Sequence, residues 1–150
     1  MENSIPSDSN TKSEASNIKN TTLPKKPSKP PKLEDKPFDE FITKFFIPEL
    51  KKSILNKGSD VNEIKLIEGN RPVVGGKCWM VFCELSYDRK FWLCFNKDII
   101  TSDKTILLSE SNSAPSIVES FLIDEKKTTL PLLISRVLQR LNGQKWIGAN

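Results

Sequence analysis

The segment most suggestive of chemistry is "GNRPVVGGKCWMVF", residues 69–82, which carries part of a phosphate-binding pattern. That pattern, G-x-x-x-x-G-K-[ST], works because backbone N–H groups and a helix N-terminus hold the phosphates while a hydroxyl binds magnesium. Here Arg71 stands at the first glycine position and Cys78 replaces the hydroxyl. A strand, not a helix, is predicted after Lys77, so we interpret the glycines as a turn. Arg71 is kept as a candidate for binding an anion.

The side chains that most enzymes use near neutral pH are scarce. The chain has no histidine, the commonest general base and metal ligand in that range. Its three cysteines, Cys78, Cys83 and Cys94, lie in apolar stretches, where a thiol is expected to be buried, reduced and unreactive. A structural zinc site needs four Cys or His ligands. We therefore predict no catalytic residues, no metal site and no cofactor.

The polar face of the last predicted helix carries residue types that anchor protein interfaces. Arg136 and Arg140 are four residues apart, and Lys145 and Trp146 follow in "GQKWIG". Arginine and tryptophan are enriched among the residues that contribute most to protein–protein binding. We predict that these four residues form a partner-binding surface. The alternative is a solvated helix face with the tryptophan packed on the edge of the sheet.

Two helical patterns must position these residues. The first begins near Pro37, is interrupted at Pro48 and ends near Lys57 with Gly58 as the stop, so we expect one kinked helix or two short ones. The second has apolar residues at helical spacing from Leu130 to Leu141. Its candidate N-cap is Thr129, Pro131 lies in its first turn, and Gly143 lies just past its predicted end. We expect this amphipathic helix to pack on a sheet.

Between the helices the sequence changes to short stretches rich in β-branched and aromatic residues. The predicted strands are "VNEIKLIEG", "GKCWMVFCEL", "KFWLCFN" and "KTILLSE", with "SYDR" as a hairpin turn. The segment "SIVESFLID" fits either a short helix or a fifth strand. In the second and third strands both alternating sets of residues are apolar, so we expect these strands to be central and at least partly covered on both faces.

The N-terminal part has a different composition. Residues 1–36 are rich in Ser, Asn, Lys and Pro, with too few apolar side chains to offset the entropy of ordering, so we predict a disordered tail and linker. Its prolines favour an extended basic arm that exposes Lys25, Lys26, Lys29 and Lys32. Residues 37–150 are predicted to form a single domain. No apolar run approaches the about 20 residues of a membrane-spanning helix, so we expect a soluble or peripheral protein.

The chain also resembles a family of uncharacterised small proteins known from cyanobacteria, with relatives in chloroplasts. The resemblance covers residues 32–148 and rests on six strings, "KPFDEFI" with "FIPELK", "EGNRPVVGGKCWMV", "FWLCF", "SFLIDEKK" and "LPLLISRVLQRLNGQKW". No activity or functional residue is implied by it. It does imply an oxygenic phototroph, and hence a role in building or maintaining the photosynthetic apparatus.

These observations predict an α+β domain in which an antiparallel sheet of four or five strands is flanked by an N-terminal kinked helix and a C-terminal amphipathic helix. The predicted function is that of a non-enzymatic accessory or assembly factor. It would bind a photosystem subunit or assembly intermediate from the cytoplasm, in peripheral contact with the cytoplasmic face of the thylakoid membrane. The alternative is a small-molecule-binding domain or unusual enzyme with a pocket between sheet and helices. Nucleic-acid binding is disfavoured because the formal charge of +4 is small.

Overall fold

The structure is a computed structural model, and it describes residues 32–123 and 127–148. The chain divides into two compact units, Met1–Lys32 and Leu33–Asn150, and the description below concerns the second. The predicted boundary, after residue 36, lies four residues later than the division between the two units, which comes after Lys32. Leu33 belongs to the second unit because it packs against the core. Of the predicted basic arm, Lys32 is exposed, while Lys25, Lys26 and Lys29 lie outside the described residues.

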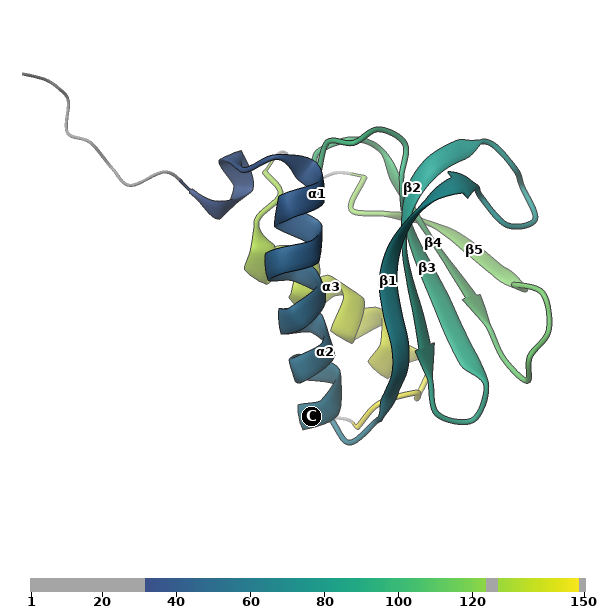
Figure 1. The fold of residues 1–150 in the computed structure, drawn as a ribbon. Helices are drawn as coiled ribbons and strands as arrows, with labels where there is room; N and C mark the ends of the chain where they lie inside the picture. The colour runs from purple at the N-terminus through teal and green to yellow at the C-terminus, as the bar shows by residue number, and fades with distance from the viewer. Residues whose placement is uncertain (1–31, 124–126, 149–150) are drawn as a thin grey trace, which may run out of the picture. The chain divides into compact units, whose positions relative to one another are not determined.

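The second unit is an α+β domain, as predicted (Figure 1). In sequence order, helical elements come before and after the strands of the sheet. Its elements are η1 (Leu33–Asp35), α1 (Phe38–Glu40), η2 (Phe41–Phe46), α2 (Ile47–Asn56), β1 (Val61–Asn70), β2 (Lys77–Leu85), β3 (Arg89–Phe95), β4 (Lys104–Ser109), β5 (Ile117–Phe121) and α3 (Leu130–Gly143). The segment left open between helix and strand is therefore a strand, β5.

The N-terminal helical segment is continuous, because α1, η2 and α2 follow one another directly in the sequence. The irregularity predicted at Pro48 appears just before it, because η2 is a π-helix in which the Ile47 N–H donates to the carbonyl of Ile42. A proline lacks the N–H of a normal helical bond, and its ring clashes with the carbonyl four residues earlier. The wider π turn moves that carbonyl away. Gly58, at φ +92°, follows the end of α2 as predicted.

The five strands form one antiparallel sheet in the order β1-β2-β3-β4-β5, in which each strand pairs with its neighbour in sequence. Tyr87 and Asp88, both at positive φ, form the predicted turn between β2 and β3. Lys77 begins β2, which confirms that a strand and not a helix follows the glycine turn.

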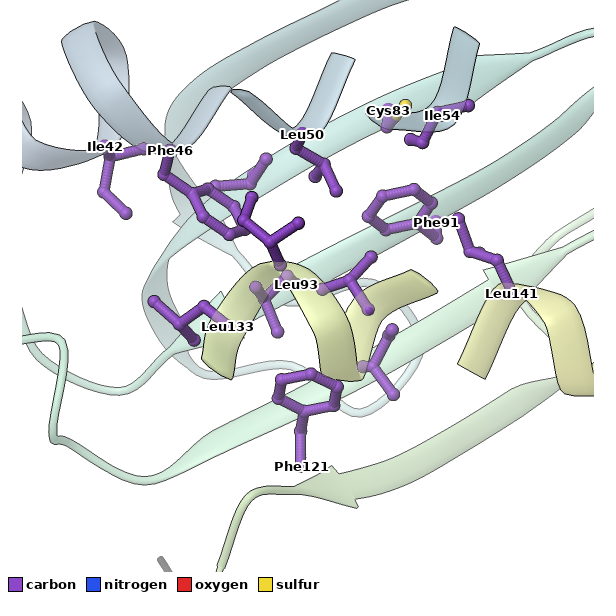
Figure 2. Packing of buried hydrophobic residues seen from close by; sticks show 14 of the residues in the cluster. Ile42, Phe46, Leu50, Ile54, Cys83, Phe91, Leu93, Phe121, Leu133 and Leu141 are labelled. Atoms are coloured by element: carbon purple, nitrogen blue, oxygen red, sulfur yellow. The ribbon is translucent and has the colours of Figure 1, made fainter. Parts of the chain in front are cut away.

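The helices lie on one side of the sheet, which we call the inner face (Figure 1). Figure 2 shows apolar side chains from the helices, among them Leu50 and Leu133, gathered around Leu93 and Phe91 of the sheet. All four are fully buried. Successive side chains of a strand point to opposite faces. The pairing register therefore gives two inner rows across the sheet, Leu66–Val81–Leu93–Ile106–Glu119 and Ile64–Cys83–Phe91–Leu108–Ile117.

Helix α3 begins as predicted and ends differently. The Leu132 N–H donates to the Thr129 hydroxyl at 3.2 Å, which confirms the N-cap. The predicted stop at Gly143 is wrong, because Gly143 is the last helical residue and the left-handed position that closes the helix is Lys145, at φ +63°. The Trp146 N–H donates to the carbonyl of Leu141, and the Lys145 N–H to that of Asn142, as in a Schellman motif.

Candidate functional site

The four residues predicted to form a partner-binding surface do not form one exposed patch. Arg136 and Lys145 are exposed. Arg140 is half-buried and binds the Glu119 carboxylate of β5 through two N–H groups, at 2.7 and 2.9 Å. This bond lowers the pKa of Glu119 and raises that of Arg140. Arg140 thus holds α3 to the sheet, and a partner would have to compete with Glu119 for it.

Trp146 is not exposed, so the expectation that it lies open on the helix surface is wrong. Its side chain is 3% exposed, and its indole Nε1–H donates to Glu110 Oε2 at 2.7 Å. This hydrogen bond is the main cause of a lowered pKa for Glu110. The alternative stated for the sequence, a tryptophan packed against the sheet, describes the structure better. Trp146 fixes the end of α3 to the end of β4.

The other side of the sheet, which we call the outer sheet face, carries no helix in the described part of the chain (Figure 1). Two rows of directly paired residues cross it, Lys65–Phe82–Trp92–Leu107–Val118 and Ile67–Met80–Cys94–Thr105–Ser120. Cys78 lies on the same face, two residues before Met80. The central strands are therefore apolar on both faces, as the sequence predicts, but helices cover only one.

Apolar side chains on the outer sheet face form a second buried cluster, and the Arg71 side chain lies against Cys94 of this cluster. Cys78, Cys94 and Leu107 are fully buried, and Met80 is 3% exposed. Trp92 packs against this cluster and remains half-buried. A sheet with one solvated face normally alternates apolar and polar residues, with the polar ones toward water. The outer sheet face departs from that rule over its central three strands.

An aromatic pair lies at the centre of this face. The ring centroids of Phe82 and Trp92 are 5.3 Å apart, with the rings tilted by 49°. Both side chains are half-buried, and Val118 at the end of the same row is 40% exposed. The Lys65 ammonium lies 5.8 Å from the Phe82 ring at the other end. Large aromatic groups that keep part of their surface exposed are typical anchors of protein interfaces.

Charges around the outer sheet face are balanced within the chain. Lys65 forms a salt bridge with Glu63 at 2.8 Å. Glu84 is directly opposite Lys90 in the register of β2 and β3. The face is thus an apolar centre with a compensated charged edge, which gives a polyanion no extended positive surface to bind.

Arg71, the candidate anion-binding residue, lies beside the outer sheet face. Its guanidinium donates to the Asn96 side chain and, at 3.4 Å, to the Gly75 carbonyl, so it closes the turn between β1 and β2. Burial raises the pKa of the Cys94 thiol to about 12, against a smaller lowering by Arg71. Both hydrogen-bond partners of Arg71 are neutral acceptors, and no finding tests anion binding. That role stays a prediction.

A pocket of about 480 Å³ lies where the N-terminal helix meets the sheet, and it is lined by Phe38, Asp39, Leu66, Ile67, Glu68, Trp79 and Asp98. Its walls combine aromatic rings with three carboxylates. One of these, Glu68, is paired with Lys77 at 3.2 Å. The composition suits a small cationic ligand better than an anion. It is the structural counterpart of the predicted pocket between sheet and helices.

Among residues 32–123 and 127–148, no cluster of three or more Cys, Asp or Glu side chains is arranged to hold a metal ion. No helix in this part of the chain is long and apolar enough to cross a bilayer. Sequence reasoning missed the outer sheet face as a site, although the apolar residues of both parities in β2 and β3 were visible. The sequence does not show which of the two alternating sets of strand residues the helices cover.

Comparison with curated proteins found no match. Residues 32–148 match the family described as "Protein of unknown function (DUF2996)". These are the same residues over which the sequence resembles a family of uncharacterised proteins. The match begins one residue before the folded unit and ends at the last described residue. The chain, with its helix-covered inner face and open apolar outer face, therefore belongs to the DUF2996 family.

Proposed function

We propose that this protein is a non-enzymatic accessory or assembly factor that binds a protein partner through the outer sheet face. The observation that carries the proposal is the aromatic pair Phe82 and Trp92, which stays partly exposed on a face that no described helix covers, with the exposed Val118 at the end of the same row. Contiguous apolar surface of this kind usually marks an interaction site in a soluble domain. The partner surface is apolar and without strong net charge, because the charges at the edge of the face are already paired.

Simple energetics support this use of the face. Completing the burial of a large apolar side chain contributes up to about 1.5–3 kcal/mol. Phe82 and Trp92 keep part of their surface exposed in the free domain, so a partner that covers both gains from each. The two rings are already in contact, at 5.3 Å between centroids. Little side-chain entropy is therefore lost on binding, which favours affinity.

The cellular setting of the proposal comes from the family resemblance noted for the sequence. We propose that the partner is a photosystem subunit or an assembly intermediate of the photosynthetic apparatus. The protein would act from the cytoplasm, in peripheral contact with the cytoplasmic face of the thylakoid membrane. An assembly intermediate is a suitable partner chemically, since it exposes apolar surface that the finished complex buries.

The proposal is tested by affinity purification of the tagged full chain and of two charged variants, Phe82→Lys and Trp92→Lys, from gently solubilised membranes and from the soluble fraction. We expect proteins that co-purify with the unaltered chain to be lost from both variants. The matched control is Leu55→Lys, which places the same charge on an apolar residue of α2 that is 45% exposed. Equal recovery of partners by all four proteins would contradict the proposal.

A second copy of the chain is a further outcome of that experiment. Light scattering of the purified protein distinguishes it, because a dimer through the outer sheet face would dissociate in Trp92→Lys and persist in Leu55→Lys. A concentration-independent monomer in every case, combined with partner loss in the two outer-face variants, would support a different protein as the occupant.

A second function is favoured by the pocket of about 480 Å³ with three carboxylates at its wall. It would bind a small cationic ligand between Trp79 and the carboxylates of Asp39 and Asp98. Thermal shift against a panel of polyamines and quaternary amines tests it, since ligand binding to the folded state raises the melting temperature. A rise that disappears in Asp98→Asn would support this function, and an unchanged melting temperature across the panel would remove it.

A further inference from the structure

Unfavourable backbone conformations are concentrated at one end of the described domain. Seven non-glycine residues have positive φ, and five of them lie in just three turns at this end. These five are Tyr87 at 64° and Asp88 at 58° between β2 and β3, Ser111 at 56° and Asn112 at 62° between β4 and β5, and Lys145 at 63° after α3. We call these three turns the turn end. Strained conformations of this kind are retained mainly where a function needs them.

The three turns are fastened to one another. The Lys90 ammonium donates to Asn112 Oδ1 at 2.7 Å, and the Asn112 N–H donates to the carbonyl of Asp88 at 3.4 Å. The third turn is joined through Trp146, which donates to Glu110. The turn end is therefore a single surface built from segments far apart in the sequence.

Two of the five residues have side chains for which the left-handed conformation is costly, although the hairpin turn and the end of α3 both require it. Asn and Asp visit this conformation readily, whereas Tyr and Lys do so at a cost. Lys145 occupies the position where a Schellman motif usually has glycine. Tyr87 is 83% exposed, so its ring contributes little buried area to the core. A glycine at either position would suit the fold better, which indicates that these side chains serve another purpose.

Arg89 lies between the aromatic groups of this surface. Its guanidinium is 5.4 Å from the Tyr87 ring and 5.9 Å from the Trp146 ring. The carboxylate that its charge affects is Glu110, whose pKa it helps to lower, and none of the salt bridges among the described residues includes Arg89. A planar guanidinium that stacks on rings keeps its N–H groups at the edge, where they match a carboxylate in a two-bond arrangement. Trp146 is itself fixed by Glu110, so the position of Arg89 is well defined.

We propose that the turn end binds the side-chain carboxylates of an acidic protein segment, with Arg89 as the two-bond donor, Tyr87 closing over the contact and Lys145 adding positive charge. This surface adjoins the edge of the outer sheet face at Lys90, whereas Arg89, Tyr87 and Lys145 lie outside the rows of that face. It goes beyond the proposed function by assigning a second surface with a different chemistry. A partner could engage either surface without the other.

The local charge favours a protein carboxylate over an extended polyanion. The positive charges of Arg89, Lys90 and Lys145 are largely offset by Asp88 and by Glu110, which already accepts the Trp146 N–H. Nucleic acids and anionic membranes are bound by larger excesses of positive charge. Here the specificity must come from directional bonds and ring contacts at one arginine. A short run of Asp or Glu side chains supplies the matching group.

The test is a titration of the isotope-labelled full chain with a synthetic peptide of alternating Glu and Gly, followed by the NMR resonance of the Trp146 indole N–H. The matched control peptide replaces Glu with Gln. We expect a saturable shift with the Glu peptide alone. Arg89→Lys keeps the charge and loses the planar donor, so it should weaken binding about tenfold. Lys51→Ala, which removes an exposed charge on α2, should leave the affinity unchanged.

Two glycine variants separate a binding role from a structural one. Tyr87→Gly and Lys145→Gly should raise the melting temperature, since glycine adopts positive φ without strain, and should weaken binding of the Glu peptide. The proposal is overturned if Arg89→Lys binds like the unaltered chain, or if both glycine variants keep full affinity. It is also overturned if single-stranded DNA or phosphatidylglycerol vesicles shift the same resonance more strongly. None of these results bears on partner binding by the outer sheet face.

Discussion

The two faces of the five-stranded sheet have similar apolar character and different surroundings. The inner row Leu66–Val81–Leu93–Ile106–Glu119 lies under the helices, and the neighbouring outer row Lys65–Phe82–Trp92–Leu107–Val118 has no helix over it. Leu93 is fully buried, whereas Trp92, its neighbour in β3, is half-buried. The two rows therefore offer an internal comparison between apolar residues covered by helices and apolar residues on a face without them.

The difference lies in residue type as well as in burial. The inner face is packed mainly with Leu, Ile, Val and Phe, which fill a close-packed core in defined rotamers. The outer cluster contains two cysteines and Met80 beneath Trp92. Sulfur-containing side chains are soft and adapt to irregular neighbours. This softer layer packs against the half-buried Trp92, whereas the inner face packs against the helices.

The largest expected effect is on the inner face. Leu93→Ala should lower the free energy of unfolding by about 2–5 kcal/mol, because it leaves a cavity between the sheet and α3 that the packed helices cannot fill. Urea denaturation of the purified chain measures this. A loss smaller than that of an outer-face substitution would mean that the helices are not the main source of stability.

Trp92→Ala on the outer sheet face is the matched change on the adjacent residue. We expect a loss of about 1–2 kcal/mol, since the indole is only half-buried and no second layer must collapse around it. Partner binding should be lost at the same time. The ratio between the two losses of unfolding free energy compares the contributions of the two faces to stability. A larger loss for Trp92→Ala than for Leu93→Ala would contradict the view that the helix-covered face contributes more.

The fold follows closely from local patterns in the sequence. Helical spacing in the two helical segments, the turn at Tyr87–Asp88, Gly58 and the Thr129 N-cap all depend on neighbours within a few residues. The stop after α3 was misplaced because the structure uses Lys145 at positive φ, a conformation that the residue type disfavours. The next residue, Trp146, is bound to Glu110 and lies near Arg89, and both contacts are long-range.

The site was less predictable because its contacts are long-range. The helical spacing of α3 predicts that Arg140 is exposed and able to bind a partner. Its hydrogen-bond partner Glu119 is 21 residues earlier in the sequence, so local spacing does not reveal it. Trp146 is held by Glu110, 36 residues away. In β2 and β3 both alternating sets of residues are apolar, and this predicted that both faces of the sheet are at least partly covered. Composition alone does not identify the face on which the helices pack.

Thiol labelling compares the protection of one cysteine on each face of the sheet. Burial raises the pKa of both Cys83 on the inner face and Cys94 on the outer face to about 12, so neither should react with iodoacetamide in the native chain. Trp92→Ala should speed labelling of Cys94, because the indole forms part of its cover, and leave Cys83 protected. Peptide mass spectrometry after short labelling times distinguishes them. Equal acceleration at both cysteines would show that the whole domain had loosened.

The smallest expected effect concerns how the helical cover is held at its edge. The Arg140 hydrogen bond lowers the pKa of Glu119 below the 4.5 of a free glutamate. The unfolded chain therefore binds this proton more tightly than the folded one, so the stabilisation is complete above pH 4.5 and is lost as the pH falls through the lower, folded pKa. Glu119→Gln should lose less stability on acidification than the unaltered chain, as measured by urea denaturation at neutral and acid pH. Equal losses would mean that α3 is held to β5 by the apolar inner rows alone.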